Sequence, residues 1–188
     1  NISNRSVISV TVVDYLFYDD CSTDKSAYYN NLSSVVMTYN SEGYYELTGS
    51  YVIAGIILCK NISVTSNIQI SVEMKLNSTS WRNNFYLLIY KDNSNYLTGY
   101  AQGEGYYRTF ENVGSTTNST ANTTQSWDKY SYVRIILTLQ GTVVNSRLET
   151  LEGTLISTHS LNITQSYTNA QIGIYTDTNN IKYFKNLK

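Results

Sequence analysis

Apolar and polar residues alternate with a period of two along much of the chain. The clearest case is residues 68–76, IQISVEMKL, and residues 131–139 show the same pattern more loosely. The apolar members of the first segment share one face: Ile68, Ile70, Val72, Met74 and Leu76. This period predicts half-buried β-strands. Because no segment sustains an apolar period of 3.6 residues between caps, we expect helices only as short turns.

The sequence has no proline, so clusters of Gly, Asn, Asp and Ser mark the turns between strands. Many short strands separated by such turns are typical of a two-sheet sandwich or a barrel. Residues 112–126, a low-complexity polar run, are predicted to form a solvated, glycosylated loop. The predicted strands cover residues 7–13, 15–18, 34–39, 43–48, 51–59, 68–76, 85–91, 96–101, 106–111, 131–139, 143–149, 154–158, 171–175 and 182–187.

Composition narrows the class of protein. A chain of 188 residues is long enough for one domain with one core. Charged residues make up only 14% of the chain, against roughly 25% in an average domain. The net charge is −1 without a basic patch, so we do not expect nucleic acid as a partner. No apolar run reaches the ~18 residues of a membrane span.

Several features indicate a secreted, extracellular glycoprotein with covalent N-glycans. The chain starts at Asn1 without methionine, as after removal of a signal peptide, although a trimmed chain would look the same. Roughly five Asn-x-Ser/Thr sequons would arise by chance under the motif's definition, and the chain has a modest excess. The predicted glycosylation sites are Asn1, Asn4, Asn31, Asn61, Asn77, Asn118, Asn122 and Asn162.

The two cysteines, Cys21 and Cys59, fit no zinc motif, and the single histidine cannot complete one. In a secreted protein we expect a disulfide between them, worth roughly 3–4 kcal/mol in the chain-entropy model. The alternative is a pair of buried free thiols.

Two stretches carry a family resemblance. Residues 15–30, YLFYDDCSTDKSAYYN, resemble the opening of concanavalin A-like and laminin G-like jelly-roll domains. Residues 130–157 and 170–188 resemble the end of such domains. The matching residues there are Ile172, Gly173, Ile174, Thr176, Tyr183, Phe184 and Asn186. The resemblance implies an all-β, two-sheet antiparallel jelly-roll sandwich over residues 14–188, preceded by an extra N-terminal strand within residues 1–13.

Some jelly rolls of this kind are glycoside hydrolases, which need two carboxylates at fixed spacing on one strand face. The corresponding Glu-x-Asp-x-x-Glu pattern is absent, and Glu73 stands alone on the face opposite the apolar one. His159 has neither a cysteine nucleophile nearby nor a Gly-x-Ser-x-Gly motif, so we interpret it as a surface or loop histidine. We therefore expect no enzyme activity.

The resemblance also suggests a carbohydrate-binding module, in which aromatic side chains stack on sugars and Asn, Gln or Arg bind hydroxyl groups. Residues 84–110 are rich in tyrosine, although every second strand residue must face the core. The candidate sugar-binding residues are Trp81, Tyr86, Tyr90, Tyr100 and Arg108. A Ca²⁺ ion between the first and last strands would be held by aspartate oxygens, unless these side chains only cap turns. The candidates are Asp19, Asp20, Asp24 and Asp177.

The strand predicted at residues 7–13 is surplus to a closed jelly roll. It could insert Ile8, Val10 and Val12 into a neighbouring subunit, as in donor-strand complementation, and such a contact propagates into a filament. Burial of these three side chains would contribute roughly 5–8 kcal/mol before entropy. This layout resembles subunits of archaeal Sulfolobus-type extracellular thread filaments. The leading hypothesis is therefore a structural subunit of a cell-surface filament that polymerises with identical subunits. A lectin-like module is the alternative.

Overall fold

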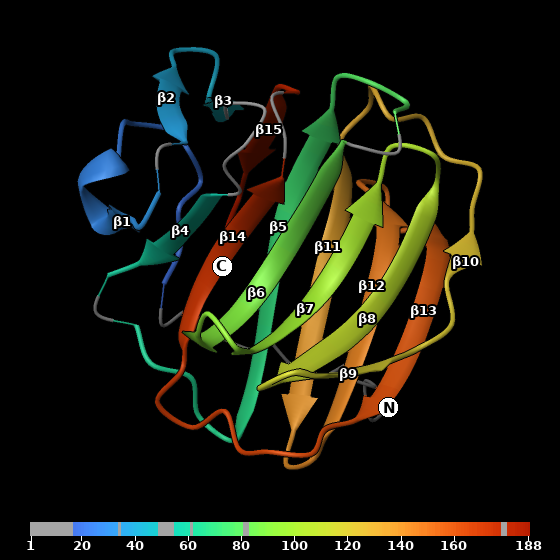
Figure 1. Ribbon diagram of the computed structural model, residues 1–188. Coiled ribbons are helices and arrows are strands. Elements are labelled where there is room, and N and C mark those ends of the chain that lie inside the picture. The colour runs from blue at the N-terminus through green and yellow to red at the C-terminus, as the bar shows by residue number, and fades with distance from the viewer. Residues whose placement is uncertain (1–16, 34, 49–54, 61, 81–82, 178–179) are drawn as a thin grey trace, which may run out of the picture.

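The computed structural model describes residues 17–33, 35–48, 55–60, 62–80, 83–177 and 180–188. These residues form two antiparallel sheets packed face to face, with β6, β7 and β8 crossing in front of β5, β11 and β12 (Figure 1). The predicted class, a two-sheet antiparallel jelly-roll sandwich, is confirmed. Among the described residues, the one helix is a 3-10 turn, η1 (Ser26–Tyr28), and no helix has the length and apolarity of a membrane span.

The eight-stranded sheet has the order β1-β4-β14-β6-β7-β8-β10, and β9 also pairs with β8. Its strands are β1 (Tyr29–Asn31), β4 (Gly55–Cys59), β6 (Asn84–Asp92), β7 (Asn95–Gln102), β8 (Tyr106–Val113), β9 (Thr116–Ser119), β10 (Thr123–Thr124) and β14 (Gln171–Asp177). The seven-stranded sheet has the order β13-β12-β11-β5-β15-β3-β2. Its strands are β2 (Val36–Asn40), β3 (Tyr44–Thr48), β5 (Asn67–Leu76), β11 (Val133–Gln140), β12 (Val143–Thr150), β13 (Leu155–Asn162) and β15 (Lys182–Lys185).

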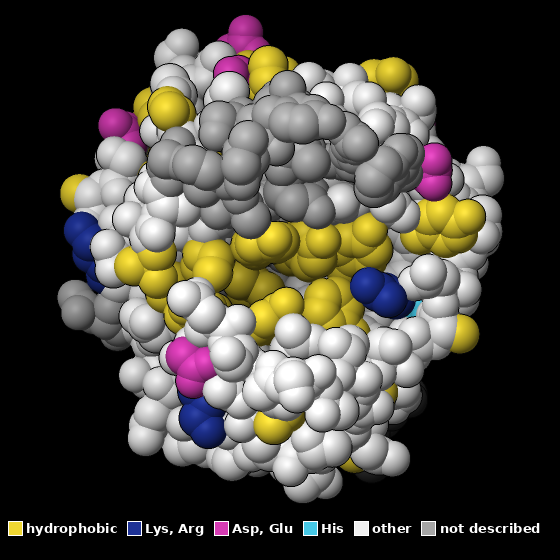
Figure 2. All heavy atoms as spheres, viewed as in Figure 1, with side chains coloured by type: hydrophobic (Ala, Val, Ile, Leu, Met, Phe, Trp, Pro, Cys, Tyr) yellow, Lys and Arg dark blue, Asp and Glu magenta, His cyan; other side chains and the backbone are white. Residues whose placement is uncertain are grey.

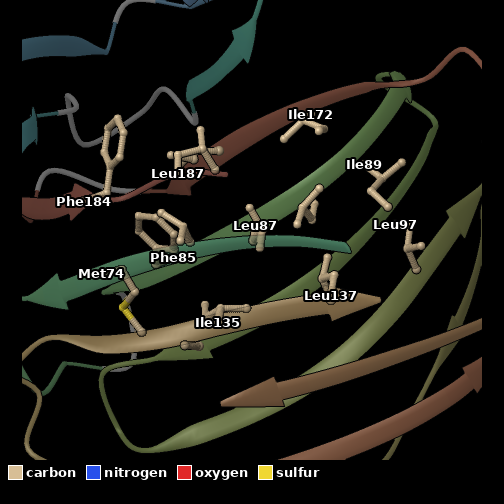
Figure 3. Packing of buried hydrophobic residues seen from close by; sticks show 14 of the residues in the cluster. Met74, Phe85, Leu87, Ile89, Leu97, Ile135, Leu137, Ile172, Phe184 and Leu187 are labelled. Carbon is tan, nitrogen blue, oxygen red and sulfur yellow. The ribbon is translucent and has the colours of Figure 1, made fainter. Parts of the chain in front are cut away.

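The core lies between the sheets and is built from the inward faces of their longer strands (Figure 3). In β5, the predicted apolar face is confirmed, since Ile70, Val72, Met74 and Leu76 are at most 1% exposed. From the opposite sheet, Phe85, Leu87 and Ile89 of β6 are fully buried. Burial of each such side chain contributes roughly 1.5–3 kcal/mol relative to exposure.

The polar run at residues 112–126 is not the loop that the sequence predicts. The strand β8 continues to Val113, and β9 pairs with it. Thr123–Thr124 form the short strand β10, which also pairs with β8. These strands lie at the edge of the sheet and their side chains are mostly exposed, so no apolar alternation is needed to form them. The short strand β1 is likewise absent from the sequence prediction.

At the N-terminal side, Phe17 and Tyr18 do not form the strand predicted for residues 15–18, and Asp19 makes an isolated bridge to Leu187. The strand predicted at residues 7–13 lies outside the described residues. The predicted boundary between residues 13 and 14 therefore stays a prediction.

The predicted disulfide is wrong for this structure, because Cys21 and Cys59 are free thiols. Both are 0% exposed and belong to the main core cluster, where a cysteine behaves as a small apolar side chain. Burial raises the pKa of each thiol to about 12. Both thiols therefore stay protonated near neutral pH and pack as apolar groups.

Candidate functional site

The outer face of the eight-stranded sheet carries a row of large side chains across five strands. Strand register places one residue of each strand in line. From β4 to β8, the row is Ile56, Tyr175, Tyr86, Tyr100 and Arg108. Because successive strand residues face opposite sides, the neighbours Ile57, Ile174 and Ala101 point into the core, where they are 0% exposed.

Tyr86 is the centre of an aromatic cluster on this face. Its ring centroid lies 4.7 Å from that of Tyr100 and 4.6 Å from that of Tyr175. The ring of Phe110, in the next row on β8, meets the Tyr86 ring edge-on at 6.3 Å and the Tyr96 ring at 6.0 Å. Edge-to-face and tilted contacts between aromatic rings stabilise the folded protein by more than the burial of their area. The rings are therefore held in place before any ligand binds.

The row beside this one provides a low floor. It runs from Leu58 through Gly173 and Leu88 to Thr98 and Phe110. Leu58 and Leu88 are at most 2% exposed and form a second apolar cluster, separate from the main core. Gly173 has no side chain, and the Leu58 side chain lies against its Cα, 2.5 Å from where a Cβ would stand. The surface is therefore lower at Gly173 than at the neighbouring tyrosines.

Leu88 and Phe110 of this second row, together with neighbouring tyrosines, line a groove of roughly 310 Å³, within the usual size range of ligand pockets. Figure 2 shows it as a hollowed hydrophobic band across this face, with a basic side chain at one end. Its lining residues are Ile56, Tyr86, Leu88, Tyr90, Asn93, Tyr96, Phe110 and Tyr175. We call this surface the aromatic groove.

Polar groups line the rim of the aromatic groove. The Tyr90 hydroxyl donates to Oδ1 of Asn93 at 2.8 Å, and Nδ2 of Asn112 donates to the Tyr96 hydroxyl at 3.0 Å. Burial raises the pKa of both tyrosines, with Asp92 adding to the effect at Tyr90. Both phenols are therefore neutral near pH 7 and keep a proton for hydrogen bonding.

The structure brings four of the five predicted sugar-binding residues to this groove or its edge, namely Tyr86, Tyr90, Tyr100 and Arg108. Trp81 lies outside the described residues. Tyr107 belongs to the same tyrosine-rich segment but faces the core and is 0% exposed.

Tyr175, Phe110 and Ile56 line the groove but are not among the predicted sites. Tyr175 follows the closing Ile172-Gly173-Ile174 motif, and alternation alone places it opposite Ile174. The alternation predicts the face of the sheet on which Tyr175 lies, but not which residues of other strands lie beside it.

Among the described residues that line the aromatic groove, there is no carboxylate pair of the glycosidase type. Glu111 of β8 is 0% exposed on the other side of the sheet, where it accepts hydrogen bonds from Thr164 N and Oγ1 at 2.8 and 2.9 Å. Glu73 does face away from the core, as predicted, but it pairs with Arg134 at 2.9 Å in the other sheet. The absence of enzyme activity stays a prediction.

His159 is not the surface or loop residue that the sequence suggests. It lies half-buried in β13, with Nε2 at 3.2 Å from the Tyr107 carbonyl oxygen and 3.1 Å from Thr123 Oγ1. These contacts join the edges of the two sheets. Burial lowers the pKa of His159, so the neutral imidazole is favoured where His159 contacts the opposite sheet.

The aspartates proposed for calcium are occupied by other partners. Asp19 accepts from Cys21 N and the Tyr29 hydroxyl, and Asp20 accepts from Ser22. Lys25 Nζ lies 3.2 Å from Asp20 and 3.8 Å from Asp19.

Asp24 accepts from Ser26 N, and the side chain of Asp177 lies outside the description. The Lys25 ammonium group lies beside Asp19 and Asp20, and calcium binding stays a prediction.

The predicted glycosylation sites differ in accessibility. Asn31, Asn122 and Asn162 are exposed, whereas Asn77 and Asn118 are half-buried. Asn118 Nδ2, the atom that a glycan would modify, donates to the Asn162 carbonyl oxygen at 2.8 Å. Asn1, Asn4 and Asn61 lie outside the described residues, and glycosylation stays a prediction at every site.

Two further hollows lie next to the segment between β10 and β11. Trp127 lines both, and so does Tyr130, which is 60% exposed. Lys129 is 7% exposed beneath them, with Nζ 4.0 Å from the Trp127 ring centroid. Burial lowers the pKa of Lys129 to about 8. Because the lysine ammonium already contacts the Trp127 ring, one face of that ring is not accessible to a ligand.

The donor-strand residues Ile8, Val10 and Val12 lie outside the described residues, and nothing here supports the filament resemblance. No protein-family model and no curated protein matches the sequence. Solved structures do match the fold. The carbohydrate-binding module CBM66 from Bacillus subtilis aligns with a TM-score of 0.67 and 12% identity over 85% of this chain and 93% of that one.

Two further neighbours share this architecture. The exoplasmic/lumenal domain of VIP36, in its Ca²⁺/Man3GlcNAc-bound form, aligns with a TM-score of 0.63 and 13% identity over 84% of this chain and 83% of that one. The β-glucanase of Bacillus licheniformis gives 0.60 and 12% identity over 91% and 95%. The chain thus has the fold of these neighbours, a two-sheet antiparallel jelly-roll sandwich. At such identities the likeness extends to the fold alone, since this fold supports both binding and catalysis.

Proposed function

We propose that this protein is a glycan-binding module and that the aromatic groove is its binding site. The observation that carries the proposal is the row of side chains from Ile56 to Arg108, which crosses five adjacent strands on one outer face. Such a row gives an extended, shallow surface suited to a chain-like ligand rather than to a compact one.

The chemistry of the groove matches that of sugars. A sugar ring has apolar C–H faces and a belt of hydroxyl groups, and the groove offers aromatic faces with a polar rim. Ligand sites commonly combine apolar and aromatic walls with a few polar groups that fix orientation. At the rim, the phenols of Tyr90 and Tyr96 and the amide of Asn93 supply those groups.

The groove is also organised before binding. The Tyr86 ring contacts the rings of Tyr100 and Tyr175, so a ligand does not have to order them. Preorganisation of this kind lowers the entropic cost of association. Two of the structural neighbours, a carbohydrate-binding module and a Man3GlcNAc-bound domain, are consistent with this use of the fold.

The test is a glycan array followed by calorimetric titration of the strongest binder with the purified chain. Tyr175→Ala and Tyr86→Ala are each expected to weaken binding at least tenfold, in line with the roughly 2 kcal/mol or more of a central aromatic contact. Tyr28→Ala is the matched control, because Tyr28 is 58% exposed outside the groove. Equal loss in all three variants, or an array without any bound glycan, contradicts the proposal.

A further inference from the structure

Arg108 lies at the β8 end of the central row, against two aromatic side chains of the groove. Its guanidinium carbon is 5.3 Å from the Tyr100 ring centroid and 4.8 Å from that of Phe110. Arginine binds aromatic faces in this way without losing its outward N–H groups. The contacts hold the charge beside the groove and fix the plane of the guanidinium.

Within the part of the chain that the structure describes, this charge has no carboxylate partner. Among the described residues, the ion pairs involve Lys25, Arg134 and Lys185 but not Arg108. Of the described residues that line the groove, none has a charged side chain.

The acidic residues nearest to Arg108 in sequence do not compensate it. Glu111 is buried on the opposite side of the sheet, where Thr164 and Gln165 occupy its oxygens. Glu104 lies exposed in the β7–β8 turn without an ion pair to Arg108.

An arginine stays charged at every physiological pH and offers its donors in a planar fork that matches carboxylate and related oxyanions. Apolar walls strengthen such a pairing, because the local dielectric is lower than that of water. A neutral sugar beside Arg108 would satisfy hydrogen bonds but leave the charge uncompensated.

We propose that the aromatic groove prefers glycans that carry an anionic oxygen group, a carboxylate or a sulfate ester, and that Arg108 binds this group. The inference rests on the proposed function. Tyr86 and Tyr175 bind the body of the sugar chain, and Arg108 selects among chains by their charge.

The experiment compares three sets of glycans on one array: neutral, uronic acid-containing and sulfated oligosaccharides. The strongest acidic binder is then titrated beside a neutral analogue, for a uronic acid its methyl ester. Wild-type protein is expected to bind the acidic form about tenfold to a hundredfold more tightly, the range of a charge-assisted hydrogen bond. This preference is expected to shrink between about 0.1 M and about 1 M NaCl, where screening shortens to a few ångströms.

Three variants separate charge recognition from folding. Arg108→Gln is expected to lose the preference for the acidic form, so that this variant binds the acidic form and the neutral analogue with affinities equal within about twofold, because the charge that distinguishes the two ligands is gone. Arg108→Lys is expected to keep part of the preference, since it retains the charge without the fork. Arg147→Gln removes an equal charge from an exposed position in the other sheet and is expected to change nothing.

The outcomes are distinct. Equal binding of neutral and acidic forms by the wild type, or an acidic preference that survives in Arg108→Gln, overturns the role of Arg108 and leaves glycan binding intact. If no glycan of any set binds, the proposed function itself fails. Preference for uronic acids over sulfates, or the reverse, identifies the anionic group.

Discussion

Tyr86 and Tyr175 meet with their ring centroids 4.6 Å apart and their planes at 74°. They come from β6 and β14, which are far apart in sequence and directly paired in the sheet, with these two residues opposite each other. This pair joins the two halves of the aromatic groove. The groove thus exists only because the last long strand of the chain lies between β4 and β6.

The first prediction concerns this pair. In a double-mutant cycle of Tyr86→Leu and Tyr175→Leu, we expect a coupling energy of about 0.5–1.5 kcal/mol, because an edge-to-face contact is worth more than the area it buries. Urea unfolding of the four proteins measures it. As a control, Tyr86→Leu with Tyr28→Leu is expected to be additive, since Tyr28 lies outside the groove. Additivity in the first cycle would contradict the contact.

Gly173 provides the second prediction. A Cβ at this position would stand 2.5 Å from Leu58 Cδ2 and 2.6 Å from the Ile57 carbonyl oxygen, so backbone must move to admit it. We expect Gly173→Ala to destabilise the fold by about 1–3 kcal/mol, as overpacking does. Ser160→Ala, at an exposed position of β13, is the control. A Gly173→Ala protein as stable as the control in urea would show that the close approach is absent.

The third prediction is a pH dependence that comes from His159. Burial lowers its pKa in the folded protein below the ordinary 6.5, so the unfolded chain takes up the proton first as pH falls. Stability is therefore fully present above pH 6.5 and declines as pH falls toward the folded pKa. His159→Gln is expected to remove this part of the slope between about pH 5 and 6.5. Identical slopes for both proteins in that window would contradict the assignment.

The fourth prediction concerns the cysteines. As free thiols with pKa values raised to about 12 by burial, Cys21 and Cys59 should resist a thiol reagent in the native state. In urea without a reductant, both are expected to react. Spectrophotometric thiol counting decides the matter, because a disulfide would yield no thiols until a reductant is added.

The sequence predicts which side of a strand each residue faces better than it predicts which strands lie next to each other. Alternation places Ile70, Val72 and Met74 in the core correctly, because side-chain direction is a local property of a strand. It does not reveal that Tyr175 lies between Ile56 and Tyr86, since that position depends on pairing between distant segments.

The residues of the aromatic groove differ in how far the sequence predicts them. Tyr86, Tyr90 and Tyr100 stand out because they are close in sequence, whereas Tyr175 joins them only through the sheet order. The strands β9 and β10 are not predicted because Thr, Asn and Ser at a solvated edge carry no apolar pattern. Gly173 belongs to the family-like motif Ile172-Gly173-Ile174, and the structure adds the physical reason for a glycine there, which is the close approach of Leu58.

The most direct test of glycan binding at the aromatic groove is an NMR titration of the ¹⁵N-labelled protein with the strongest binder from the array. We expect the shifted amide signals to cluster on β4, β14, β6, β7 and β8 around Tyr86 and Tyr175, and to stay unshifted in Tyr175→Ala at the same ligand concentration. Shifts that cluster instead around Trp127 and Tyr130, or no shifts at all, would contradict the account.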